Sequence, residues 1–128
     1  MFQIVFNAIS AAEMSALPVE LQLDMIAEFQ ILPENLDHLD PAKFGKVEHH
    51  GHTLHRCHAG DFRIYFERVE EGILIHRVLH KNTLGDFLYR SHLSLFEEDK
   101  RLGKIPGFWK LIEEGVKSGK EKLGEKFK

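Results

Sequence analysis

The segment from residue 51 to residue 81 constrains the fold most, because it reads as three short strands joined by tight turns. The turns are Ala59-Gly60-Asp61 and Glu70-Glu71-Gly72, and they separate runs rich in aromatic and β-branched residues. A glycine in each turn supplies the positive φ that a tight hairpin needs. The connections are too short for crossovers, so the three strands must be antiparallel. We therefore expect a three-strand meander.

Side-chain alternation sorts the polar residues of this meander onto its two faces. One face of the first strand carries Arg56 and His58, and one face of the second strand carries Arg63 and Tyr65. The opposite face of the second strand is apolar. Arg56 and Arg63 share a face if the hairpin register brings their two faces together. This polar face is either a binding site or a solvated surface.

The flanking segments are expected to complete an α+β domain, in which an N-terminal strand and two helices pack on the antiparallel sheet. Residues 2–9 suit a strand that joins the edge of the meander. The capping-box pattern Ser10-Ala-Ala-Glu13 predicts a helix start, and the spacing of Leu21, Met25 and Phe29 predicts a helix to about Leu32. Residues 33–50 read as a surface loop, and residues 83–95 as a further helix.

The last 32 residues differ in kind from the domain expected over residues 1–96. Residues 97–107 look like a linker, and the apolar spacing from Phe108 to Phe127 is helical. Gly115, Gly119 and Gly124 interrupt that helix, and each costs about 1 kcal/mol relative to alanine. We expect residues 97–128 to form a linker and an amphipathic helical extension that needs a partner surface, on its own domain or on another chain such as a second copy in a homodimer.

Composition limits the class of protein. A single cysteine allows no intramolecular disulfide, and the chain has no signal-peptide pattern and no membrane-spanning apolar run, so we expect a cytoplasmic protein with no membrane partner. The net charge of −3 argues mildly against a nucleic-acid-binding protein. Residues 49–96, however, hold six basic residues against five acidic ones and eight of the nine histidines, which leaves this segment as the candidate.

The run Arg56-x-x-x-Gly60-Asp61-Phe62-Arg63-Ile64-x-Phe66, followed by an apolar strand that ends in His80-Lys81, resembles the RelE/ParE toxin superfamily over about residues 2–96. The resemblance implies a toxin-like protein of a toxin–antitoxin system, silenced by an antitoxin protein that wraps over it. The RelE branch cuts mRNA in the ribosomal A site, and the ParE branch poisons DNA gyrase. The resemblance therefore implies a ribosome-dependent mRNA endonuclease that represses translation, and no metal or organic cofactor.

The resemblance also assigns roles to single residues. Arg63 matches the arginine that stabilises the phosphate, and Arg56 matches a basic residue of the preceding strand. Lys81 stands where the family has its second arginine and lacks the bidentate fork of a guanidinium. Phe87 or Tyr89 stands where the family has a tyrosine, and Phe87 would lack the hydroxyl, so activity is expected to be reduced or absent if these substitutions matter.

Cleavage of RNA by such a site needs a base for the 2′-hydroxyl, stabilisation of the pentavalent phosphate and an acid for the 5′-oxygen. Arg56, Arg63 and Lys81 supply positive charge for the phosphate. His58, His80 and Tyr89 are the candidates for proton transfer. Tyr65 is a candidate to stack on a base of the substrate.

Two other functions remain open at this point. The first is a non-catalytic binding protein of the same fold, either a gyrase-directed toxin or an inactive relative that acts through a protein partner. The 13 acidic against eight basic residues of positions 1–96 favour it. The second is a metal-responsive protein built on the histidine run His49, His50, His52, His55 and His58, although the run lacks the spacing of an established zinc motif.

Overall fold

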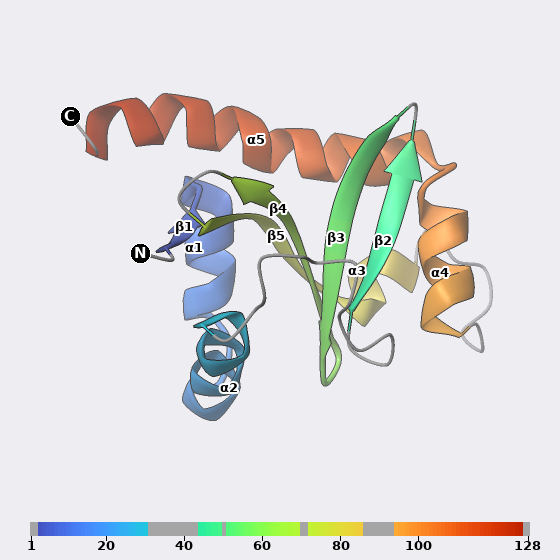
Figure 1. Ribbon diagram of the computed structural model, residues 1–128, viewed down its shortest axis with the longest axis horizontal. Helices are drawn as coiled ribbons and strands as arrows, with labels where there is room; N and C mark the ends of the chain where they lie inside the picture. Colours follow the sequence, from blue (N-terminus) through green and yellow to red (C-terminus); the bar gives the residue numbers. More distant parts are fainter. Residues whose placement is uncertain (1–2, 31–43, 50, 70–71, 86–93, 127–128) are drawn as a thin grey trace.

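The computed structural model describes residues 3–30, 44–49, 51–69, 72–85 and 94–126, which form a five-stranded mixed sheet with helices on both faces (Figure 1). The strand order is β1-β5-β4-β3-β2. The strands are β1 (Gln3–Phe6), β2 (Phe44–His49), β3 (His52–Ala59), β4 (Phe62–Val69) and β5 (Gly72–His80). The helices are α1 (Ala8–Ser15), α2 (Val19–Gln30), α3 (Lys81–Gly85), α4 (Leu95–Leu102) and α5 (Pro106–Lys126).

The predicted α+β class and the predicted meander are confirmed. Strands β3, β4 and β5 pair antiparallel in sequence order, and β1 pairs parallel with β5 at the edge of the sheet. The turn at Gly60 has a φ of 57°, as the hairpin requires. The loop expected over residues 33–50 is wrong for its last part, because β2 pairs antiparallel with β3. Pairing with β3 organises this segment, which has little apolar alternation of its own; residues 31–43 lie outside the described part.

The first helix begins earlier than its sequence pattern predicts. Asn7 is the N-cap of α1, and its side-chain oxygen accepts a hydrogen bond of 2.7 Å from the backbone N–H of Ser10. The Ser10 hydroxyl accepts in return from the backbone N–H of Asn7 at 3.0 Å. The capping box is therefore Asn7 and Ser10 rather than Ser10 and Glu13. The helix expected over residues 83–95 falls largely on residues 86–93, outside the described part.

The side chains at the start of α1 continue the sheet edge after β1 ends at Phe6. The Asn7 amide donates to the carbonyl of His76 at 2.9 Å, and the Ser10 hydroxyl donates to the carbonyl of Ile75 at 2.7 Å. The Glu13 carboxylate accepts from the backbone N–H of Val78 at 3.0 Å. Helix α1 thus satisfies the backbone groups of β5 that a longer β1 would pair with.

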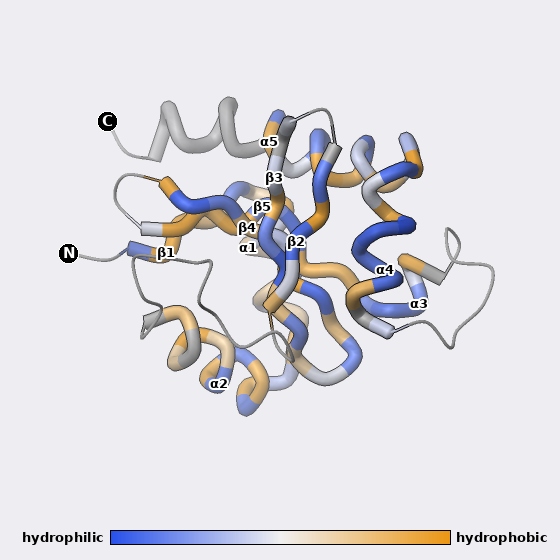
Figure 2. Tube along the Cα trace, turned by 45° about the vertical axis from the view of Figure 1, so that its right-hand side comes forward, coloured by the Kyte–Doolittle hydropathy of each residue, from blue (hydrophilic) through white to orange (hydrophobic). Residues whose placement is uncertain are grey.

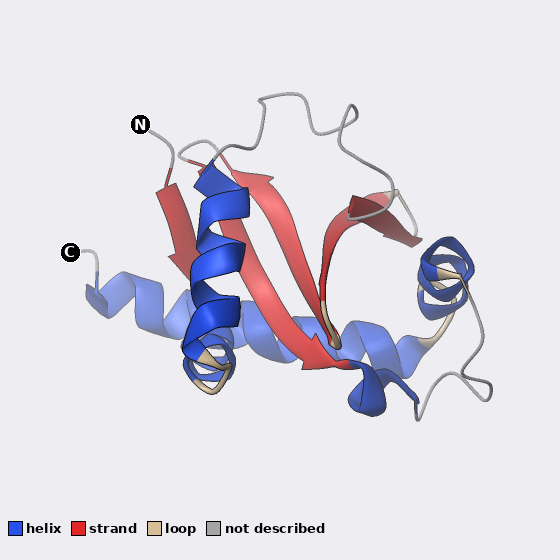
Figure 3. Ribbon diagram, turned by 90° about the horizontal axis from the view of Figure 1, so that it is seen from below, coloured by secondary structure: helices blue, strands red, loops and turns tan. Residues whose placement is uncertain are grey.

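Helices α1 and α2 cover one face of the sheet, and α5 runs along the other (Figure 3). The first face packs Met14, Leu17, Met25 and Phe29 against the apolar side chains of β4 and β5. The second face packs Leu102, Phe108 and Ile112 against Val47, Leu54, Tyr65 and Leu79. The sheet therefore lies between two apolar layers, each of which removes its side chains from water.

Residues 97–101, expected to form a linker, belong to α4. The Ser94 side chain caps this helix by accepting from the backbone N–H of Glu97 at 3.2 Å. Figure 2 shows why the segment resembles a linker, since α4 is mostly hydrophilic between apolar ends. Helix α5 runs continuously through its three glycines, and its partner surface is the sheet of its own chain. None of the described helices is long and apolar enough to cross a membrane.

Gly115 permits close contact between α5 and β5. A Cβ at this position would overlap the backbone carbonyl of His76. The glycine that weakens the helix in isolation is therefore the residue that lets α5 approach the sheet.

Candidate functional site

The register between β3 and β4 brings the predicted polar residues together. Arg56 lies opposite Tyr65, and His58 lies opposite Arg63, so all four side chains share one face of the sheet. We call this the arginine face. It is neither an open site nor a solvated surface in this structure, because α4 and α5 pack against it.

Arg56 forms a buried ion pair with Asp99 of α4. Its Nε donates to Oδ1 at 3.2 Å and its Nη2 donates to Oδ2 at 2.9 Å, while Arg56 is only 1% exposed and Asp99 2% exposed. Burial raises the pKa of Asp99, and the hydrogen bond from Arg56 opposes that rise. The two parallel hydrogen bonds give the pair the bidentate geometry in which a guanidinium binds a planar anion.

Arg63 forms a second ion pair with the neighbouring residue of α4. Its Nε donates to Oε2 of Glu98 at 3.0 Å, and both side chains are largely buried. Its Nη1 also reaches the carbonyl of Gly60 at 3.5 Å. Two consecutive carboxylates of α4 therefore hold Arg56 and Arg63.

His58 and Tyr65 lie beside these pairs, and the pKa values of the two side chains are shifted in opposite directions. Burial lowers the pKa of the half-buried His58, and the positive charge of Arg63 lowers it further, so the imidazole is neutral at pH 7. Burial raises the pKa of Tyr65 well above its usual value, and the negative charge of Glu98 adds to the rise. The Tyr65 hydroxyl has no hydrogen-bond partner among the described residues. Its ring is fully buried and packs edge-to-face on Phe108, so it has no open face for a substrate base.

The structure does not bring His80 to the arginine face. The register between β4 and β5 shifts by one residue between Tyr65 and Phe66. Beyond this bulge His80 pairs with Phe62 and its ring packs edge-to-face on the Phe62 ring, on the face that α1 and α2 cover. Its Nδ1 accepts from the backbone N–H of Asn82 at 3.0 Å.

Lys81 begins α3, and its ammonium lies 3.3 Å from Oδ1 of Asp61 with both side chains about half exposed. The structure records no contact between Lys81 and either the Arg56–Asp99 pair or the Arg63–Glu98 pair. Tyr89 and Phe87 lie outside the described residues. Of the predicted site residues that the structure describes, Arg56, Arg63, His58 and Tyr65 lie together, and the role of Tyr89 stays a prediction.

Sequence reasoning missed the two carboxylates, Glu98 and Asp99, because their segment was assigned to a linker. The signal was present, since Ser94 followed by Glu97 is a helix N-terminal pattern and Leu95 and Leu102 flank the acidic stretch. What the sequence lacked was any indication that the acidic side of α4 faces inward.

Among the side chains that the structure describes, no three His, Cys, Asp or Glu residues group as metal ligands. Of the histidine run, His50 and the side chains of His49 and His52 lie outside the described part. His55 stacks on Phe66 with ring centroids 5.5 Å apart.

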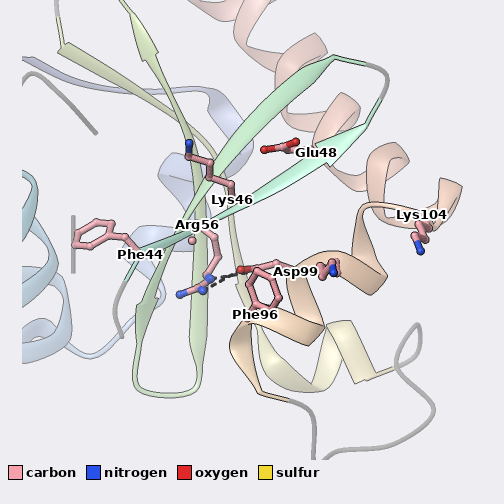
Figure 4. A pocket seen from close by; sticks show the side chains of 9 residues that line it. Phe44, Lys46, Glu48, Arg56, Phe96, Asp99 and Lys104 are labelled. Carbon is pink, nitrogen blue, oxygen red and sulfur yellow. Dashed lines mark hydrogen bonds and ion pairs between the residues drawn. The ribbon is translucent and has the colours of Figure 1, made fainter. Parts of the chain in front are cut away.

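A cavity of about 510 Å³ lies between β2 and α4, and the Arg56–Asp99 pair forms part of its wall (Figure 4). Gly45 of β2 lies against this pair, and a Cβ there would overlap both Arg56 Nη2 and Asp99 Oδ2. The remaining lining residues are Phe44, Lys46, Glu48, Phe96, Lys100 and Lys104.

Comparisons with models of protein families, with curated proteins and with solved structures found no match to this chain. The fold and the site define an α+β protein with a mixed five-stranded sheet in its described residues, in which two buried arginines on one face are paired with carboxylates of a covering helix.

Proposed function

We propose that the chain is a toxin-like endoribonuclease of RelE/ParE type, whose phosphate-binding arginines are covered by α4 in the form described here. The supporting observation is that Arg56 and Arg63 share one face and each binds a carboxylate. A guanidinium that binds a carboxylate through charged hydrogen bonds also binds a phosphate. The carboxylates of α4 therefore occupy the positions in which a phosphodiester would bind.

The arginine face carries the groups that RNA cleavage requires once α4 moves away from the arginines and α5 moves away from Tyr65. The 2′-oxygen attacks the adjacent phosphorus and the bond to the 5′-oxygen breaks, which leaves a 2′,3′-cyclic phosphate and a 5′-hydroxyl. Neutral His58 accepts the 2′-hydroxyl proton, and Tyr65, which keeps its proton at neutral pH, donates to the 5′-oxygen. Arg56 and Arg63 stabilise the charge that develops on the phosphate.

The role of α4 follows from the same contacts. Neutral amides at positions 98 and 99 would keep the shape of the two side chains and remove the charges that compete with phosphate. We therefore expect the variant Glu98→Gln/Asp99→Asn to cleave RNA faster than the wild type. An antitoxin and the ribosome are the partners that this function implies.

The test is expression in growing cells, with mRNA 5′ ends mapped relative to the ribosomal A site. Glu98→Gln/Asp99→Asn should arrest growth with A-site cleavage, and adding Arg63→Ala should reduce that cleavage at least about a hundredfold. Arg101→Ala, which removes an exposed arginine of α4, should have no effect. Folded variants that cause neither arrest nor cleavage would exclude the nuclease, and arrest with DNA damage would point to gyrase instead.

The second candidate is a non-catalytic binding protein of the same fold. The burial of both arginines favours it, since a paired, buried arginine also serves to fix how two elements pack. This candidate predicts no cleavage from any variant and retained binding of a protein partner by the Arg63→Ala protein.

A further inference from the structure

We propose that the cavity between β2 and α4 binds a nucleotide unit of single-stranded RNA. The cavity is separate from the four residues assigned to proton transfer and phosphate binding, except that it reaches Arg56. The inference takes RNA as its ligand from the proposed function and assigns it a binding subsite.

The size of the cavity suits a nucleotide. Its volume of about 510 Å³ falls within the range of small-molecule sites, roughly 300–1,000 Å³. Phe96 of α4 lines it with an aromatic ring beside the Arg56–Asp99 pair in Figure 4. The ring of the other aromatic lining residue, Phe44 of β2, points to the opposite face of the sheet and packs edge-to-face on Phe66.

Phe96 is the feature of this cavity that packing does not explain. Phe96 is 67% exposed, although a large aromatic residue gains most when buried. The Lys100 ammonium lies over one face of the ring, 5.1 Å from its centroid. The ring is therefore a platform with a cation beside it, the combination on which single-stranded nucleic acids stack their bases.

The charges around the cavity favour an anion. Lys100 and Lys104 line it from α4 and the residues that follow α4, and the two exposed charged residues of β2 that line it, Lys46 and Glu48, carry opposite charges. Asp99, the other acidic residue of the wall, is already paired with Arg56. An acidic peptide could pair its carboxylates with the lysines, but most of its residues have no flat ring to stack on Phe96. Each RNA nucleotide supplies both a phosphate for a lysine and a base for the ring.

The contact with Arg56 links the cavity to the arginine face. A phosphate that reaches the wall of the cavity meets the guanidinium that Asp99 holds, so the phosphate and Asp99 compete for one cation. Removing the charge of Asp99 should therefore strengthen RNA binding in this cavity.

The test is fluorescence anisotropy of a labelled single-stranded 2′-O-methyl RNA, which cannot be cleaved through its 2′-oxygen, with the full chain at several salt concentrations. Phe96→Ala should weaken binding about tenfold, the loss expected for one stacked base. Lys100→Ala and Lys104→Ala should each lower the slope of log affinity against log salt by about 0.7. Asp99→Asn should bind more tightly than the wild type.

Matched controls lie elsewhere on the surface. Leu23→Ala removes an exposed apolar side chain of α2, and Lys110→Ala removes an exposed lysine of α5. Both should bind within twofold of the wild type. Circular dichroism of each variant verifies that the fold is kept.

Three outcomes would overturn the inference: no RNA binding by the wild type, RNA binding that Phe96→Ala leaves unchanged, or binding of adenosine monophosphate without binding of the RNA strand. The result is separable from the cleavage test. Cleavage in cells with unchanged RNA binding by Phe96→Ala contradicts this subsite alone, whereas Phe96-dependent binding without cleavage by any variant contradicts the nuclease alone.

Discussion

Gly45 lies so close to the guanidinium group of Arg56 that a side chain at position 45 would occupy the same space. The buried pair of Arg56 and Asp99 therefore depends on a residue of β2 that makes no hydrogen bond to it through a side chain. We expect Gly45→Ala to lower the free energy of unfolding by about 2–3 kcal/mol, because the methyl group pushes the two charges apart. Urea unfolding measures the loss.

The same substitution in an Arg56→Leu/Asp99→Leu background separates this cause from a general effect of alanine on β2. With no ion pair to disturb, Gly45→Ala should cost at least about 1 kcal/mol less there. Equal costs in the two backgrounds would contradict the dependence of the pair on Gly45.

Arg77 offers an internal comparison between two carboxylate partners. Its Nε and Nη2 donate to Glu13 of α1 at 3.0 and 2.8 Å, and its Nη1 lies 3.4 Å from Glu114 of α5. Glu13 also accepts from the sheet backbone, whereas the Glu114 side chain is 60% exposed. Glu13→Gln should destabilise the fold by about 2 kcal/mol, and Glu114→Gln by less than about 0.5 kcal/mol. Thermal or urea unfolding of both variants measures the two losses of stability. Equal losses would contradict the prediction that Glu13 is the more important partner.

Tyr65→Phe should separate stability from activity. The buried hydroxyl has no hydrogen-bond partner among the described residues, so its removal should leave stability unchanged or raise it by about 1 kcal/mol. Cleavage should fall if Tyr65 donates the proton to the 5′-oxygen. A loss of more than 1 kcal/mol on urea unfolding would show that the hydroxyl is satisfied in solution.

The same residue predicts a loss of stability in alkali. The pKa of Tyr65 in the folded state is raised above 10.0. The contribution of the neutral Tyr65 hydroxyl to the free energy of unfolding is therefore fully present below pH 10, and it is lost as the pH rises toward the folded pKa. Wild-type stability should therefore fall more steeply above pH 10 than that of Tyr65→Phe. Parallel curves for the two proteins would contradict the burial of the ring.

Asp99 predicts a pH dependence at the acidic end. Its folded pKa is raised above 3.8, so the folded state binds this proton more readily than the unfolded state does. The stabilisation that this bound proton gives to the folded state is fully present below pH 3.8. It is lost as the pH rises through the folded pKa of Asp99. Asp99→Asn should therefore gain stability relative to the wild type across that window. Asp24→Asn, which removes an exposed carboxylate of α2, controls for the loss of one negative charge.

Gly115→Ala sets helix propensity against packing. Propensity alone predicts a gain of about 1 kcal/mol in α5. The overlap of the new methyl group with the carbonyl of His76 predicts a loss of about 1–3 kcal/mol, and we expect the loss to prevail because the overlapped atom is backbone. Urea unfolding decides the sign, and a net gain would show that α5 can shift outward at little cost.

The sequence predicts the meander because it follows from turn residues and from alternation over short distances. It leaves the shared face of Arg56 and Arg63 dependent on the hairpin register, which the pairing of β3 with β4 supplies. It does not predict the place of His80, because one bulge between Tyr65 and Phe66 shifts the alternation along β5. Without that bulge His80 would lie on the face of Arg63. A bulge depends on packing across the whole sheet and leaves no local signal in this stretch.

The elements that the sequence misses depend on contacts between distant residues. Strand β2 forms through pairing with β3, and the inward side of α4 is acidic because the sheet presents arginines to it. Hydrophobic periodicity finds helices that bury apolar side chains, whereas the middle of α4 buries Glu98 and Asp99. A buried charge pair is visible only when both partners are placed.

Both helices that cover the arginine face follow all five described strands in the chain. During synthesis all five strands leave the ribosome before α4 and α5 do, because the chain is made from its N-terminus. Until those two helices follow, Leu54, Tyr65, Arg56 and Arg63 lack the elements that bury them. The order of elements thus gives the nascent protein a surface that the finished protein hides.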